Sequence, residues 1–240
     1  MLTAIVGVNW GDEGKGRMVD LLSERYDVVV RYQGGNNAGH TVVNDKGKFI
    51  LNLMPSGILR DGTVNVLGPG MVVDVEHLCA EAARLREGGI AVTPENLKIS
   101  DKATICMPYH KLLDGLEEDR LAGKKFGSTR RGIAPVYADK YMKKTLRMGD
   151  LLDLEAHAEH LADIVEWKNL TVEKGYGHEP IRTEDVMAWL REFGLPWAEF
   201  VCDTTRYLNE VIGQGKNVLF EAQLGALRDI DFGIFPYTSS

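Results

Sequence analysis

The sequence predicts an α/β protein with a mainly parallel central sheet, flanking helices and a helical insertion. A strand, a glycine-rich loop, a helix and a second strand follow one another over residues 2–32, and this alternation is typical of parallel sheets. Hydrophobic residues make up 44% of the 240 positions, which is enough for one sizeable core. Because no shift in composition marks a boundary, residues 1–240 are expected to form a single domain.

The first half of the chain alternates strands and helices. Leu2–Val8 is an apolar, partly β-branched run that predicts a strand and ends before the glycines of residues 11–16. Apolar residues at helical spacing predict a helix over Met18–Tyr26, and the buried-type run Asp27–Tyr32 predicts the next strand. Further strands are expected at Phe49–Leu53 and Val64–Leu67. The helix expected at Val75–Glu87 ends at two glycines, a common C-terminal signal.

The second half is mostly helical. Apolar spacing predicts helices at Pro108–Leu121, Leu154–Trp167, Thr183–Phe193 and Cys202–Ile212. Lys216–Phe220 follows as a late strand. The late helices predict an insertion over about residues 151–208. The chain stops at Ser240 with neither a capping helix nor a polar tail, so it is expected to be truncated at its C-terminus.

Composition and charge exclude several classes of protein. A net charge of −7, with no basic run interleaved with aromatic residues, argues against a nucleic-acid partner. No run approaches the ~20 apolar residues of a membrane span, and the start lacks a charged leader, so a cytoplasmic protein without membrane association is expected. The three cysteines form no CxxC pair, so neither a disulfide framework nor a zinc site is indicated.

The most informative segment is the loop Asn9–Arg17, between the first strand and the first helix. Its glycines let the backbone approach a phosphate, its N–H groups point at that phosphate, and Lys15 adds a positive charge. The ordinary nucleotide loop, GxxxxGK[ST], has a hydroxyl residue after the lysine, where Gly16 stands here. A carboxylate in such a loop makes sense if Asp12 binds Mg²⁺ or removes a proton during transfer. The competing interpretation is a plain glycine turn.

A second glycine-rich loop, Gln33–Thr41, leaves the carboxyl end of a predicted strand, where open α/β sheets bind their ligands. The two loops could therefore face one crevice. His40 is the side chain here that could donate a proton or a hydrogen bond near neutral pH, although a lone histidine is more often structural. His157 and His160 could share a helix face, where nearby glutamates favour a solvated face over a metal site.

A third segment, Lys124–Gly132, combines hydroxyls, glycines and cations in the manner of a site for a second phosphate. A charged surface loop is the alternative. The basic character continues at Lys140, Lys143, Lys144 and Arg147. In an acidic protein this suits an anionic small molecule or a contact between subunits better than a nucleic acid.

Several motifs occur in one order: WGDEGKG, RYQGGNNAGHT, LMPSGIL, GSTRRGIAP followed by DK, and DIDFGIFPYTSS. With them the chain resembles the adenylosuccinate synthetase family over essentially its whole length. The resemblance implies a homodimeric, GTP-binding ligase of purine biosynthesis that joins IMP to L-aspartate with GTP and Mg²⁺. It also implies the route: O6 of IMP attacks the γ-phosphate of GTP, and the aspartate amine then displaces phosphate from 6-phosphoryl-IMP.

The resemblance also implies roles for individual residues. Asp12 would be the base that removes the N1 proton of IMP and a magnesium ligand, and His40 the acid at the phosphoryl group. Lys15 would act on the phosphates, and the Gly39 carbonyl would be a second magnesium ligand. The residues implied for the GTP phosphates are Gly11, Asp12, Glu13, Gly14, Lys15, Gly16, Arg17, Gly39, His40 and Thr41. Those implied for IMP are Asp12, Glu13, Gly14, Lys15, Asn37, Ala38, Gly39, His40, Thr129, Lys143, Gln223 and Thr238.

The sequence departs from the family pattern at several of these positions. Arg130 stands where the family commonly has glycine, at a backbone position that would need positive φ. Lys143 replaces an arginine that the family lends to the neighbouring subunit's IMP phosphate, which keeps the charge but loses the bidentate fork. Gln223 matches the IMP-binding glutamine only with a one-residue shift, and Ser239 rivals Thr238 for the other IMP position.

Family members also continue beyond residue 240, into segments that hold the aspartate carboxylate and recognise guanine. The alternative to a complete ligase is therefore a catalytically incomplete fragment or module that binds IMP or phosphate without turnover. An unrelated P-loop kinase or GTPase is disfavoured, because Gly16 lacks the hydroxyl and no NKxD-type motif occurs. A Rossmann redox enzyme would need GxGxxG with an acid ~20 residues further on, a spacing that this loop does not supply.

Overall fold

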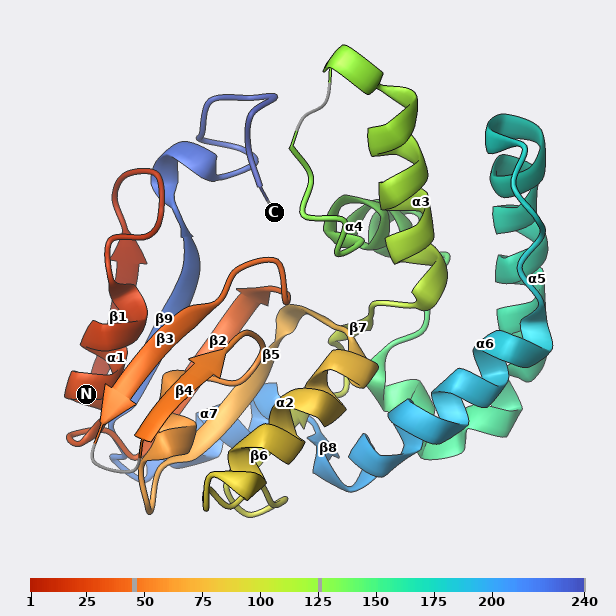
Figure 1. The fold of residues 1–240 in the computed structure, drawn as a ribbon. Helices are drawn as coiled ribbons and strands as arrows, with labels where there is room; N and C mark the ends of the chain where they lie inside the picture. Colours follow the sequence, from red (N-terminus) through yellow and green to blue (C-terminus); the bar gives the residue numbers. More distant parts are fainter. Residues whose placement is uncertain (45–46, 125–126, 240) are drawn as a thin grey trace.

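The computed structural model describes residues 1–44, 47–124 and 127–239 (Figure 1). Its main sheet has seven strands in the order β1-β9-β2-β5-β6-β8, with β7 paired to β5, and every pair is parallel. The strands are β1 (Leu2–Gly7), β2 (Val28–Gly34), β5 (Val64–Val73), β6 (Leu97–Ser100), β7 (Thr104–Ile105), β8 (Val201–Cys202) and β9 (Val218–Gly225). The predicted α/β class with a mainly parallel sheet is confirmed.

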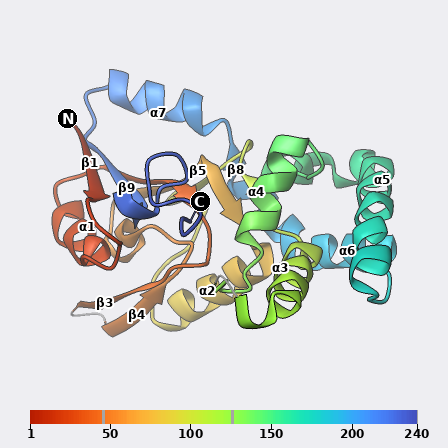
Figure 2. The same cartoon turned by 90° about the horizontal axis from the view of Figure 1, so that it is seen from above.

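Helices cover both faces of this sheet. They are α1 (Lys15–Ser23), α2 (Val75–Glu87), α3 (Pro108–Arg120), α4 (Ile133–Met142), α5 (Ala158–Asn169), α6 (Thr183–Trp189) and α7 (Thr204–Gly213). Figure 2 shows α7 on one face and α1 and α2 on the other. The valines of β2 follow this division, because successive strand side chains point to opposite faces. Val28 and Val30 pack in the cluster under α7, and Val29 packs in the cluster with Val19 of α1.

A hairpin outside the main sheet corrects two expectations. β3 (His40–Asn44) and β4 (Gly47–Leu51) pair antiparallel with each other. His40 and Thr41, expected in a loop, therefore begin a strand. The strand expected at Phe49–Leu53 exists as β4, but it pairs with β3 rather than with the parallel sheet. The hairpin lies on the core through the buried side chains of Val42, Phe49 and Leu51, while Val43 and Ile50 are exposed.

The late strand lies in the middle of the sheet. β9 begins at Val218, continues to Gly225, and pairs with β1 on one side and β2 on the other. At its end, Gly225 approaches the first loop so closely that a Cβ there would be 2.0 Å from the Asn9 carbonyl oxygen and 2.3 Å from the Gly11 nitrogen. This contact between backbones fixes the start of the first loop against β9.

Gly225→Ala is expected to lower the free energy of unfolding by about 1–3 kcal/mol, because neither the strand nor the loop backbone can make room for the methyl group. Urea denaturation followed by circular dichroism measures the effect. Gly213→Ala is the matched control, because Gly213 ends α7 with nothing within 4 Å of its Cβ position. That variant is expected to be as stable as the parent or slightly more stable. Equal stability losses in the two variants would contradict the close-approach argument.

The helical segment beside the sheet runs from Met148 to Phe200 (Figure 1). It contains α5, α6 and short 3₁₀ and π turns. It ends before the expected boundary near residue 208, because Val201–Cys202 forms β8 beside β6 and α7 then covers the sheet. One hydrophobic cluster joins Leu161 and Leu190 of this segment to Leu78 and Ile99 of the α/β part. The insertion therefore shares its core with the sheet.

A buried network ties three helices together. His110 of α3 contacts Asp139 of α4 with 2.8 Å between Nε2 and Oδ2, and the Lys168 ammonium of α5 donates to the other oxygen of that carboxylate. All three residues are less than 5% exposed. The Met107 N–H donates to His110 Nδ1 at 2.9 Å, so Nε2 carries the imidazole proton and donates to Asp139. Burial lowers the pKa of His110, which keeps the ring neutral.

Candidate functional site

The two glycine loops lie at the carboxyl edge of the sheet, where β1 and β2 end on either side of β9. In the first loop, Gly11, Asp12 and Gly14 have φ values of 94°, 59° and 85°. Gly14 caps α1 without a side-chain hydrogen bond, so the N–H groups of the first helical turn are not satisfied by a capping side chain. This arrangement is typical of an anion site at a helix N-terminus.

The first loop holds a carboxylate of its own. Glu13 accepts hydrogen bonds from the N–H groups of Asn9 and Gly11, at 3.1 and 3.0 Å, and from the Lys15 ammonium at 2.8 Å. The Lys15 contact, with help from these N–H groups, lowers the pKa of Glu13 to about 2. Lys15 and the loop backbone are therefore arranged to bind negatively charged oxygen atoms, which is the requirement of a phosphate cradle.

The two loops are in contact through Gly16 and His40. A Cβ on Gly16 would be 2.1 Å from His40 Cδ2 and 2.7 Å from Nε2, so the imidazole packs directly on the glycine backbone. This contact explains the departure from the GK[ST] pattern, because a serine or threonine at this position would displace the histidine ring. Burial, with a smaller contribution from Arg31, lowers the pKa of His40 to about 4. The ring is therefore neutral at pH 7 and can donate one hydrogen bond.

Gln223 joins the second loop from β9. Its Nε2 donates to the Gly35 carbonyl at 3.1 Å and to Asn37 Oδ1. A Cβ on Gly34 would be 1.3 Å from Gln223 Oε1, so this position needs glycine for space as well as for its φ of 84°. The one-residue shift in sequence register therefore still places a glutamine beside Asn37.

Near the C-terminus, Thr238 and Ser239 were the two rival candidates for contact with IMP. Asn37 Nδ2 donates to the hydroxyl of Ser239 at 3.4 Å. Thr238, the residue chosen from the sequence, makes no such bond among the described residues. Ser239, its rival in the sequence interpretation, is therefore the hydroxyl that the structure brings to the second loop.

Asp12 and Gly39 offer oxygen atoms at the exposed rim of the loops. Both residues are exposed. Asp12 makes no ion pair within the part of the chain that the structure describes. A cluster of three or more histidine, cysteine, aspartate or glutamate ligands is likewise absent from residues 1–44, 47–124 and 127–239. One carboxylate and one carbonyl fit Mg²⁺, which is usually held by one or two protein oxygens together with substrate phosphates and water.

The helix α4, which directly follows the third segment, contacts the second loop. The Gly34 N–H donates to the Tyr137 hydroxyl of α4 at 3.0 Å, and a Cβ on Gly35 would be 2.8 Å from Ile133 Cδ1. Arg130, whose side chain was expected to alter a backbone shape that needs positive φ, has a φ of 56°, and its guanidinium pairs with Asp119 of α3. The loop therefore keeps its glycine-type backbone although an arginine stands there.

Other predicted residues of this region are not brought together with the loops. Thr129 is exposed beside Arg130, and Lys125 and Phe126 lie outside the described residues. Lys143 caps the opposite end of α4, exposed, with a φ of 61°. Because a helix rises about 1.5 Å per residue, Lys143 lies roughly 15 Å along the axis from Ile133. Arg17 and Thr41 are exposed next to the loops and make no hydrogen bond to another site residue in the described ranges.

Two buried residues near His40 were not singled out from the sequence. His40 Nε2 lies 2.8 Å from the Ser56 hydroxyl, and Ser56 in turn contacts the Glu221 carboxylate. Ser56 belongs to the motif LMPSGIL, and Glu221 is the one charged residue of the strand VLFEAQLG. The single charged residue in this largely apolar strand was the available signal, because glutamate is almost never fully buried without a partner.

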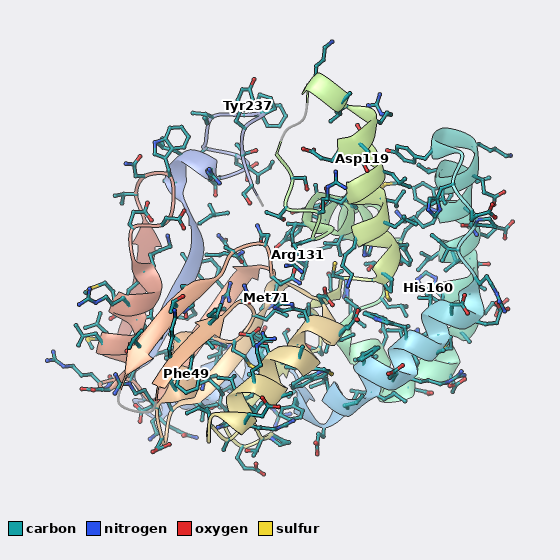
Figure 3. All side chains as sticks on the ribbon, viewed as in Figure 1. Phe49, Met71, Asp119, Arg131, His160 and Tyr237 are labelled. Atoms are coloured by element: carbon teal, nitrogen blue, oxygen red, sulfur yellow. The ribbon has the colours of Figure 1, made fainter. Side chains whose placement is uncertain are left out.

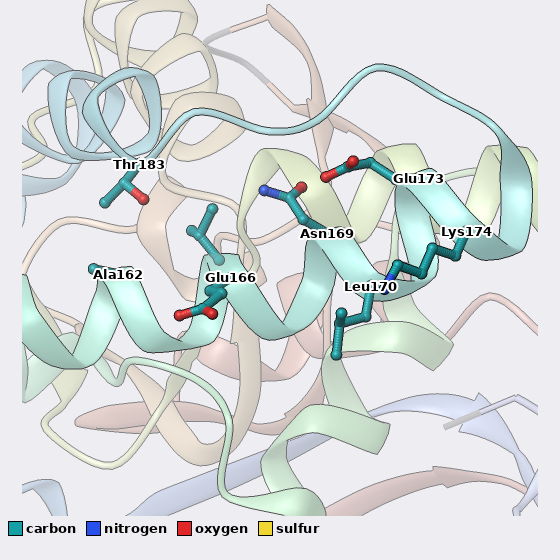
Figure 4. A pocket seen from close by; sticks show the side chains of 8 residues that line it. Ala162, Glu166, Asn169, Leu170, Glu173, Lys174 and Thr183 are labelled. Atoms are coloured by element: carbon teal, nitrogen blue, oxygen red, sulfur yellow. The ribbon is translucent and has the colours of Figure 1, made fainter.

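Of the remaining histidines, His77 contacts Asn52, whose side chain donates to the Ala38 carbonyl of the second loop, whereas the open hollows of the surface lie elsewhere. His160 is on α5, away from Met71 near the carboxyl end of β5 (Figure 3). A hollow on the helical insertion is lined by Ala162, Val165, Glu166, Asn169, Leu170, Glu173, Lys174 and Thr183 (Figure 4). None of these residues belongs to the predicted site. In the part of the chain that is described, no helix is both long enough and apolar enough to cross a membrane.

Comparison with known proteins identifies the family of the chain. The family described as adenylosuccinate synthetase matches residues 4–240. The chain belongs to the adenylosuccinate synthetase family. The adenylosuccinate synthetases of Geobacillus kaustophilus and Bacillus subtilis are 46% and 44% identical to it over 236 residues, which is 98% of this chain. The match covers 55% and 54% of those relatives, so the chain spans about half their length.

Two solved structures share the fold of the chain. The structure of fully ligated adenylosuccinate synthetase from Plasmodium falciparum superimposes on 99% of this chain with a TM-score of 0.88 at 32% identity, and the match covers 55% of that adenylosuccinate synthetase. The cyanophage S-2L succinoaminodeoxyadenylate synthetase, bound to dGMP and dATP, has a TM-score of 0.67 at 22% identity. This second likeness shows the fold alone.

Proposed function

We propose that the chain carries the phosphate- and IMP-binding loops of an adenylosuccinate synthetase, the GTP-dependent ligase of AMP biosynthesis that joins IMP to L-aspartate. The observation that carries the proposal is the contact between the two loops at Gly16 and His40, which brings a phosphate cradle and a neutral histidine to one edge of the sheet. The family to which the chain belongs supports the choice of reaction. Residues 1–240 would act as a single nucleotide-binding domain in the cytoplasm, without a nucleic-acid or membrane partner.

The geometry suits phosphoryl transfer to O6 of IMP. Asp12 would take the N1 proton, so that O6 becomes nucleophilic and attacks the γ-phosphate of GTP, giving 6-phosphoryl-IMP and releasing GDP. Lys15 and the loop N–H groups would hold the phosphates, and the neutral imidazole of His40 would donate a hydrogen bond to an oxygen that gains charge. Asp12 and the Gly39 carbonyl would hold Mg²⁺, which supplies charge neutralisation when bound. The aspartate amine would then displace phosphate.

The base of IMP would lie by the second loop, on Asn37, Ala38 and Gln223. Thr129 and either Thr238 or Ser239 would take the ribose phosphate. Lys143 lies at the far end of α4 from these groups, which favours a homodimer in which it serves the partner's IMP rather than its own. A module that binds IMP or phosphate without turnover is the second candidate, and the assay below distinguishes it from the complete ligase.

The test measures adenylosuccinate formation by ultraviolet absorbance with IMP, GTP, Mg²⁺ and L-aspartate, for the chain and for Asp12→Asn. Loss of a general base is expected to lower the rate by about 10²–10⁴-fold. IMP binding, measured by calorimetry, is expected to persist in the variant. A chain that binds IMP but shows no turnover would be the incomplete module, and a chain that neither binds IMP nor turns over would contradict both candidates.

A further inference from the structure

A chain of hydrogen bonds runs from His40 into the core of the sheet. His40 Nε2 lies 2.8 Å from Ser56 Oγ, on the ring edge that packs against Gly16. Ser56 Oγ donates to Glu221 Oε1 at 3.3 Å, and the Ser56 N–H donates to Glu221 Oε2 at 3.1 Å. Ser56 is fully buried and Glu221 is 4% exposed. The imidazole is thus attached through one serine to a carboxylate in β9.

The Glu221 carboxylate is buried in β9, beside Arg31 of β2. Burying a charge is costly unless it is paired and hydrogen-bonded, and burial raises the pKa of Glu221. Arg31 is its cross-strand neighbour on β2, and the charge of Arg31 opposes that rise. Arg31 donates its own Nη1 hydrogen bond to the Asn52 carbonyl, and its buried Nε has no partner among the described residues. The two bonds from Ser56 are therefore the direct hydrogen bonds of this carboxylate.

The direction of the bonds fixes the proton of the imidazole. The Ser56 N–H donates to one oxygen of Glu221 and the Ser56 hydroxyl donates to the other, so the Ser56 hydroxyl proton points to Glu221. The lone pairs of the same hydroxyl then accept the proton on His40 Nε2. In this arrangement Nε2 carries the proton, and Nδ1, on the opposite ring edge, is the unprotonated nitrogen.

We propose that Ser56 and Glu221 are positioning residues for His40: they hold its ring against Gly16 and set which nitrogen carries the proton. The proposal rests on the proposed function for its catalytic meaning, since His40 is the residue assigned to the phosphoryl group. The orientation of the His40 ring and the nitrogen that carries its proton can be tested without turnover. If a proton from solvent binds Nδ1, Nε2 can pass its own proton to Ser56 while Ser56 passes its proton to Glu221; the neutral ring then carries its proton on Nδ1 and can present that N–H to an oxygen on the other edge.

The test uses ¹⁵N NMR of the histidine rings at pH 8 in the unliganded chain. The His40 resonances, assigned with His40→Gln, are expected to show a protonated, pyrrole-type Nε2 and an unprotonated, pyridine-type Nδ1. A His40 ring that averages both tautomers in the parent chain would overturn the proposal without any variant.

Two variants sharpen the test. Ser56→Ala is expected to give averaged His40 resonances, because Nε2 loses its acceptor. Glu221→Gln is expected to shift the proton toward Nδ1, because the glutamine amide can donate to Ser56 and turn the serine hydroxyl toward Nε2. Ser100→Ala, at another fully buried serine, and the resonances of His77 control for general effects of the substitutions. Unchanged His40 resonances in folded Glu221→Gln would contradict the proposal.

Kinetics separate this proposal from the proposed function. If the chain forms adenylosuccinate, Ser56→Ala is expected to lower kcat by about 10- to 100-fold with little change in the KM for IMP, because orientation and not binding is lost. A response of the His40 resonances in a chain without turnover would support the positioning role while the ligase function failed. Normal kcat in Ser56→Ala would overturn the role of this serine in catalysis.

Discussion

Lys168→Met is expected to lower the free energy of unfolding by about 3–5 kcal/mol at pH 8, because it removes one partner of a buried ion pair. The Asp139 carboxyl group would stay at 2% exposure, with His110 as its remaining partner in this network. The methionine fills a similar volume, so the loss of charge compensation dominates over cavity formation. Urea denaturation followed by circular dichroism measures the change.

The loss is expected to shrink as the pH falls below about 6.5. Burial is the main cause of the lowered pKa of His110, and the charge of Lys168 lowers it further. Without Lys168, the His110–Asp139 pair binds a proton more readily. A folded-state pKa below the unfolded value, which is ~6.5 for histidine, costs stability as the pH falls below ~6.5, and this cost is smaller where the pKa is lowered less. The deficit of the variant relative to the parent is therefore largest at pH 8.

An exposed lysine provides the control. Lys216 pairs with Asp27 at 3.0 Å between Nζ and Oδ1, with about half of its side chain in solvent. Lys216→Met is expected to cost less than about 1 kcal/mol, since exposed ion pairs contribute little. If Lys168→Met cost no more than Lys216→Met, the network would not tie the insertion to the sheet.

Local patterns predicted most of the α/β elements but not the order of the strands. The helix expected at Val75–Glu87 is α2 with the same bounds, and the valine run of β2 was expected where it lies. The short strands β6 to β8 carry two to four residues, too few for a periodic pattern. The placement of β9 between β1 and β2 depends on tertiary packing that no local pattern encodes.

Some residues of the candidate site could likewise be predicted from the sequence and others could not. Gly11 to Gly16 and His40 could be found because phosphate loops need glycine and charge at fixed positions. Glu221 and Ser56 could not, because their importance depends on β9 lying beside β2. The helix α4 was not expected, since it follows a basic loop and has Pro135 in its first turn, a position where proline is tolerated. Lys143 was expected at the IMP phosphate of the neighbouring subunit, and within one chain it lies at the far end of α4.

Gly16→Ser restores the hydroxyl of the ordinary nucleotide loop, yet it is expected to lower the rate of the proposed reaction by about 100-fold. The new Cβ would lie 2.1 Å from His40 Cδ2, and the backbone of Gly16 is held in the first turn of α1. The imidazole must therefore move, and displacement of a catalytic group by about 1 Å costs roughly this factor. Adenylosuccinate formation measures the rate.

The stability of the chain offers a second measurement that needs no turnover. Moving the imidazole breaks the bond between His40 and Ser56, which is expected to cost about 1 kcal/mol. In a His40→Ala background the serine meets no ring, so Gly16→Ser is expected to cost much less there. This non-additivity in a double-mutant cycle identifies the ring as the group that excludes a side chain at position 16. Equal costs in both backgrounds would mean that the loop backbone itself, and not His40, requires the glycine.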